Sequence, residues 1–118
     1  MFRGRVPFSL HAALELVTAT ALIAVPFMIG LSVNATITAA MLGVMLFGLA
    51  VSATAPEGRG TLPVSAHQTY DAAVALVLVG AAIVFGLVGE VPALMFLLAA
   101  GIAQLTLNTF TRYAPSRA

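Results

Sequence analysis

The sequence predicts an all-α integral membrane protein, with four transmembrane helices arranged as two tandem hairpins in one domain. Hydrophobic residues make up 61% of the 118-residue chain and charged residues only 8%, and the mean hydropathy is +1.09. Soluble domains usually carry about 25% charged residues, so this chain cannot cover a surface that faces water. The apolar residues also come in long blocks, which is typical of membrane spans.

Four apolar segments of 20 to 23 residues stand out in the chain: 9–30, 35–54, 66–88 and 92–111. About 20 helical residues are needed to cross a hydrocarbon core of roughly 30 Å. Short turns join the first segment to the second and the third to the fourth, whereas a longer linker rich in Gly and Pro separates the pairs. We therefore divide the single domain, residues 1–118, into a first repeat (7–54), a linker (55–62) and a second repeat (63–111).

The basic residues predict the orientation of the chain. All five are arginines, and they lie before the first segment, in the linker and after the last segment: Arg3, Arg5, Arg59, Arg112 and Arg117. The positive-inside rule therefore places both termini in the cytoplasm. The net charge of +1 gives no basic patch for nucleic acid, and the absence of cysteine excludes disulfides and thiolate metal sites.

The two halves of the chain share a motif. A shift of 56 residues aligns P-F-S-L-H-A-A-L-E (7–15) with P-V-S-A-H-Q-T-Y-D (63–71), so both follow the pattern P-x-S-x-H-x-x-x-[ED]. The same shift aligns Gly30 with Gly86 near the two hairpin turns. Because two crossings separate the copies, we expect parallel repeats related by an axis along the membrane normal.

Part of the motif is typical of a helix start. Pro7 and Pro63 favour an extended chain, and serines follow two residues later. Ser9 and Ser65 are therefore expected to be the N-caps, with Gln68 completing a capping box in the second copy.

The histidines and acids of the motif predict a polar pocket. His11 and Glu15 are four residues apart, as are His67 and Asp71, so each pair lies on one helix face. A charge inside the bilayer costs a few kcal/mol unless it is paired, so we expect both pairs to turn inward near the pseudo-two-fold axis. Three further polar residues at a similar depth are expected in this cytoplasmic-side pocket: Tyr70, Gln104 and Asn108.

Four functions fit this pattern. Hydrogen-bonded pairs would hold a bundle together in a scaffold or accessory subunit of a membrane complex, with a membrane-protein partner or further copies of the chain. His11, Glu15, His67 and Asp71 would instead bind Zn²⁺, Fe²⁺ or Mn²⁺, or the two histidines would hold a haem. A small proton-coupled transporter is the fourth, since the chain is similar in outline to the small multidrug resistance transporters. No catalytic residue stands out, which favours a function other than an enzyme.

The first hairpin resembles the SPW repeat family of small bacterial membrane proteins. The resemblance covers residues 22–50, where Val25, Pro26 and Phe27 occupy the positions of the family's Ser-Pro-Trp triplet. Gly30 then follows, and Asn34 opens the next helix. Only the proline of the triplet is present, and the second hairpin departs further. The resemblance implies a multi-pass protein of the bacterial cytoplasmic (inner) membrane, built from two repeats.

Overall fold

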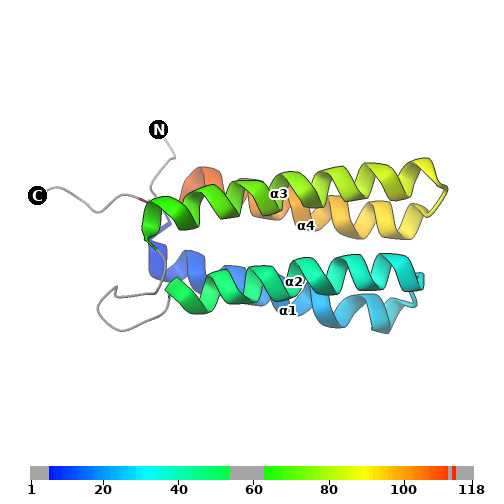
Figure 1. Ribbon diagram of the computed structural model, residues 1–118, viewed down its shortest axis with the longest axis horizontal. Coiled ribbons are helices and arrows are strands. Elements are labelled where there is room, and N and C mark those ends of the chain that lie inside the picture. The colour runs from blue at the N-terminus through cyan, green and yellow to red at the C-terminus, as the bar shows by residue number, and fades with distance from the viewer. Residues whose placement is uncertain (1–5, 54–62, 112, 114–118) are drawn as a thin grey trace, which may run out of the picture.

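The computed structural model describes residues 6–53, 63–111 and 113, which form four helices in two antiparallel hairpins (Figure 1). The helices are α1 (Phe8–Ile29), α2 (Val33–Ala53), α3 (Val64–Leu87) and α4 (Val91–Phe110). These bounds agree with the four predicted segments to within two residues. The five arginines and the predicted linker, residues 55–62, lie outside the described residues.

The surface of the bundle is apolar. All four helices are long and apolar enough to span a membrane, and only 22–33% of each span is buried inside the protein. Large apolar side chains such as Phe27, Met28 and Leu87 are more than 70% exposed. Such a surface is stable in lipid and not in water, so the prediction of a multi-pass, all-α membrane protein is confirmed.

The start of each hairpin differs from the expectation. Pro7 and Pro63 are themselves the N-cap residues of α1 and α3, with extended backbone and no side-chain cap bond. Their carbonyl groups accept the first helical bonds, from the backbone N–H groups of His11 and His67 at 3.0 and 2.9 Å. The predicted serine caps and the capping box are therefore wrong. A proline already has the extended conformation that an N-cap requires, so the helix begins directly after it.

The helices pack closely within each hairpin. A Cβ atom added at Gly43 of α2 would lie 2.8 Å from Ile23 Cγ1 of α1, and one added at Gly101 of α4 would lie 2.8 Å from Val79 Cγ2 of α3. The turns differ, because Gly30 ends α1 in the left-handed conformation whereas Gly86 still lies inside α3. The helix α3 is two residues longer than α1, with 24 residues against 22, so the glycines aligned in sequence do not occupy matching places.

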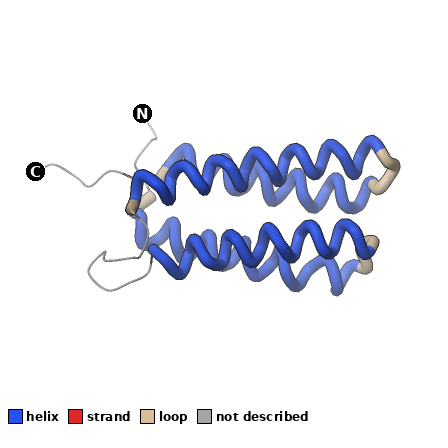
Figure 2. The backbone as a smooth tube through the Cα atoms, viewed as in Figure 1, coloured by secondary structure: helices blue, strands red, loops and turns tan. Residues whose placement is uncertain are grey.

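The two hairpins lie side by side (Figure 2), and an apolar core fills the space between them. Its buried side chains come from all four helices: Ala19, Leu22, Ala39, Leu42, Leu46, Val74, Leu78, Ala82 and Leu97. We call the end of the bundle that holds Phe8 and Phe110 the cluster end, because the ionisable side chains of His11, Glu15, His67 and Asp71 lie there. The end that holds Gly30 and Gly89 is the turn end. At the turn end, the Ser32 hydroxyl donates a hydrogen bond of 2.5 Å to Glu90 Oε1, which links the hairpins.

Candidate metal centre

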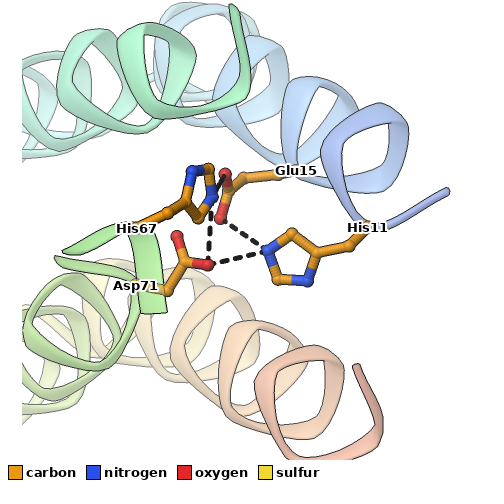
Figure 3. A group of neighbouring side chains, drawn as sticks. All are labelled: His11, Glu15, His67 and Asp71. Carbon is orange, nitrogen blue, oxygen red and sulfur yellow. Dashed lines mark hydrogen bonds and ion pairs between the residues drawn. The ribbon is translucent and has the colours of Figure 1, made fainter. Parts of the chain in front are cut away.

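Four ionisable side chains meet between α1 and α3 at the cluster end (Figure 3). His11 and Glu15 come from α1, His67 and Asp71 come from α3, and all four are 0% exposed. Each residue offers one nitrogen or carboxylate oxygen such that all four atoms lie within 4.8 Å of one another. The spacing of four residues turns each pair inward, as the sequence predicts, and the packing of the hairpins brings the pairs together.

Nitrogen and oxygen atoms alternate around this cluster. His11 Nε2 lies 2.8 Å from Asp71 Oδ2 and 3.2 Å from Glu15 Oε2. His67 Nε2 lies 3.0 Å from Glu15 Oε1 and 3.1 Å from Asp71 Oδ2. Both imidazoles therefore present Nε2 to two carboxylates.

The spacing suits a small metal ion. Ligands about 2.0–2.1 Å from a tetrahedral zinc ion are separated from one another by roughly 3.3 Å, and in a square arrangement by roughly 3.0 Å. The nitrogen–oxygen distances of 2.8–3.2 Å lie close to both values. The four donor atoms, one from each residue, lie within 4.8 Å of one another, so the most widely separated of them would move closer when an ion binds. Two carboxylates also balance the charge of one divalent ion, while neutral imidazole is a preferred ligand of Zn²⁺ and Fe²⁺.

Thr111 determines which nitrogen of His11 is free to bind a metal. Its hydroxyl donates its one proton to the carbonyl oxygen of Leu107, at 2.5 Å. The contact of 2.6 Å between His11 Nδ1 and Thr111 Oγ1 is then a bond in which Nδ1–H donates. Nε2, the atom that faces the carboxylates, carries the lone pair of the neutral ring. Metal-binding histidines are commonly oriented by such a bond on the other nitrogen.

Gln104 supports Glu15 from α4. Its Nε2 donates one proton to Glu15 Oε2 and the other to Asn108 Oδ1, each at 2.9 Å. Gln104 is 1% exposed, and Asn108 is partly buried beside it. The predicted contribution of both residues to a polar pocket agrees with this placement.

Tyr113 covers the cluster from the segment after α4. Its hydroxyl lies 2.8 Å from Asp71 Oδ2 and 3.0 Å from Asn108 Oδ1, so its single proton is donated to the closer, charged oxygen. Burial and the nearby charge of Asp71 raise the pKa of Tyr113 far above its ordinary value, which keeps the hydroxyl protonated. Phe8 packs against both histidine rings, with ring centroids 5.8 Å from His11 and 4.9 Å from His67.

Three of these supporting residues were missed in the sequence: Phe8, Thr111 and Tyr113. Thr111 continues the helical spacing of Gln104 and Asn108, so that stripe could have been extended to it. Phe8 and Tyr113 carry no comparable pattern. Tyr113 reaches the cluster because Val6 N–H donates a bond of 2.9 Å to the Phe110 carbonyl, which holds the two ends of the described chain together.

Tyr70 does not lie where the sequence places it. Its side chain is 52% exposed on α3 and does not line a buried pocket with Gln104 and Asn108. Tyr70 directly precedes Asp71, and consecutive residues of a helix point about 100° apart. Since Asp71 faces the cluster, its neighbour faces away from it.

The four candidate ligands differ in the hydrogen bonds that orient their side chains. Four buried polar atoms have no hydrogen-bond partner among the described residues: His67 Nδ1, Asp71 Oδ1, Gln104 Oε1 and Asn108 Nδ2. His11, Glu15 and Asp71 each form a hydrogen bond with α4 or the segment after it, with His11 as the donor and the two carboxylates as acceptors, whereas His67 Nδ1 forms none among the described residues. Comparisons with protein-family models, curated proteins and solved structures gave no match.

Proposed function

We propose that this multi-pass membrane protein binds one divalent transition-metal ion between its two hairpins. The ligands would be His11, Glu15, His67 and Asp71. The observation that carries the proposal is that four fully buried ligand residues, two from each hairpin, bring their donor atoms within 4.8 Å of one another. Buried ionisable groups in a membrane protein are costly and usually functional. Zn²⁺, Fe²⁺ and Mn²⁺ are the candidate ions for this set of nitrogen and oxygen donors.

The scaffold interpretation remains the main alternative. If each imidazole carries a second proton, the two positive histidines balance the two negative carboxylates. The same four side chains then form a hydrogen-bonded ring with no net charge, which holds the hairpins together without a metal. The donor set favours the metal, because two imidazoles and two carboxylates, all fully buried, bring their donor atoms within 4.8 Å of one another.

Haem and proton-coupled transport receive less support. The rings of His11 and His67 lie edge to face with centroids 5.6 Å apart, and carboxylate oxygens contact both Nε2 atoms, which leaves no slot for a flat macrocycle. A proton path needs polar groups on both sides of the cluster. Among the described residues, the buried polar side chains are the cluster itself with Gln104 and Thr111.

We infer the wider setting from sequence patterns. The arginines support cytoplasmic termini, and the cluster would then lie on the cytoplasmic side. The shared motif, which supplies one His–acid pair to each hairpin, supports descent from a two-helix repeat. A bacterial inner membrane and membership of the SPW repeat family stay predictions that rest on the resemblance of residues 22–50.

Elemental analysis tests the metal proposal. The protein is purified in mild detergent without chelator, and bound Zn, Fe and Mn are measured per chain. We expect close to one equivalent in the wild type and less than about a tenth in the double variant His11→Ala/His67→Ala. Thr109→Val, a change on the exposed face of α4, is the matched control and should retain the ion.

Absence of a transition metal from wild-type protein, both as isolated and after incubation with each ion, would overturn the proposal. Two readouts on the same sample address the alternatives. A Soret absorption band would point to haem, and a stable co-purifying membrane protein without bound metal would support the scaffold interpretation.

A further inference from the structure

The forces that hold the two hairpins together differ from those within each hairpin. The close approaches at Gly43 and Gly101 join α1 to α2 and α3 to α4, and the most extensive helix contacts are also those within the hairpins. Between the hairpins the core is apolar. In lipid such a core gains little from the hydrophobic effect, because the lipid tails are as apolar as the side chains. Polar links must therefore contribute much of the preference for the joined state.

Polar links between the hairpins occur at both ends of the bundle. At the turn end, Ser32 bonds to Glu90 across the hairpins. At the cluster end, each hairpin supplies one histidine and one carboxylate, and His11–Asp71 and His67–Glu15 cross the interface at 2.8 and 3.0 Å. Further bonds from α4 to Glu15 and from His11 to Thr111 cross the same interface.

The geometry of the cluster also indicates what kind of metal site it is. Four protein ligands complete a tetrahedral shell, whereas catalytic zinc sites keep one position for water or substrate. Phe8 and Tyr113 cover the cluster at its outer side. Further along α1 and α3 the apolar core begins, and Leu22 and Leu78, two turns beyond Glu15 and Asp71, are fully buried in it. The site is thus suited to a resident ion.

We propose that the metal ion is a structural clasp that joins the two hairpins at the cluster end of the bundle. This inference rests on the proposed metal site and assigns it a role. Bonds from one ion to ligands on both hairpins hold α1 and α3 together where lipid provides no driving force. Without the ion, each hairpin keeps its own close packing and the turn end stays closed through Ser32 and Glu90. At the cluster end, the hydrogen bonds of Val6 and Gln104 across the interface remain, but the ligands of the two hairpins are no longer bound to one ion, and this end opens.

Distance measurements between spin labels test the clasp, because the chain has no cysteine of its own. One pair of introduced cysteines, Leu10→Cys with Tyr70→Cys, places labels on exposed sites of α1 and α3 at the cluster end. A matched pair, Met28→Cys with Leu87→Cys, does so at the turn end. Distances are compared in protein prepared from metal-depleted cultures and after one equivalent of the ion is added, with metal content measured on the same samples.

We expect the cluster-end distance to be longer by several ångströms and more broadly distributed in the metal-free protein, and to narrow when the ion is added. The turn-end distance should not change. Stoichiometric binding that leaves both distances unchanged would overturn the clasp while the metal site stands. Equal lengthening at both ends would also overturn it, since the link between Ser32 and Glu90 predicts an opening at one end only. Absence of binding would overturn the metal site itself.

Discussion

Replacement of Gln104 by leucine removes a bond to a candidate metal ligand while it preserves the size of a buried side chain. In the folded protein, Gln104 Nε2 donates to Glu15 Oε2 at 2.9 Å, and His11 Nε2 lies 3.2 Å from the same oxygen. Leucine leaves this carboxylate oxygen without its closest donor. A hydrogen bond to a charged group contributes about 1.5–3 kcal/mol, and each 1.4 kcal/mol changes an equilibrium constant tenfold.

We therefore expect Gln104→Leu to weaken metal affinity by about 10- to 100-fold, in line with the effect of other outer-shell substitutions. The assay is a competition titration of the detergent-purified protein against a coloured chelator of known affinity. Thr109→Val on the exposed face of the same helix is the control and should bind as the wild type does. If Gln104→Leu retained affinity within about twofold of the control, the role assigned to this bond would be refuted.

Three further predictions concern packing, the turn end and pH. Gly43→Ala should destabilise the bundle by about 1–3 kcal/mol, because its Cβ would lie 2.9 Å from a backbone oxygen of α1, whereas Gly48→Ala, with nothing within 4 Å, should be neutral or stabilising in thermal unfolding. Ser32→Ala should lower stability by about 1–2 kcal/mol, through loss of both its bond to Glu90 and its bond to the backbone of α2, while metal content stays unchanged. The raised pKa of Tyr113 means that its stabilising contribution is complete below the unfolded value of about 10 and is lost progressively as the pH rises beyond it, so Tyr113→Phe should show a shallower loss of stability above about pH 10.

The candidate ligands could be predicted because helical spacing is a local property. Residues four apart lie on one face whatever surrounds the helix, and burial of a charge in lipid demands a partner. The two His–acid pairs, His11 with Glu15 and His67 with Asp71, could therefore be grouped from the sequence alone. The same reasoning is wrong for Tyr70, because a similar depth in the membrane does not determine which face of a helix a residue occupies.

The four spans, their pairing into hairpins and the four candidate ligands follow from the amino-acid sequence, because hydropathy, turn length and helical period are properties of short segments. Three features require the packed bundle: the two His–acid pairs meet in one ring, Thr111 and Gln104 orient His11 and Glu15, and Tyr113 covers Asp71. Each of those contacts joins residues 42 to 100 positions apart. Such contacts depend on how the hairpins pack, and the apolar helix faces that set this packing resemble one another too closely in sequence to specify it.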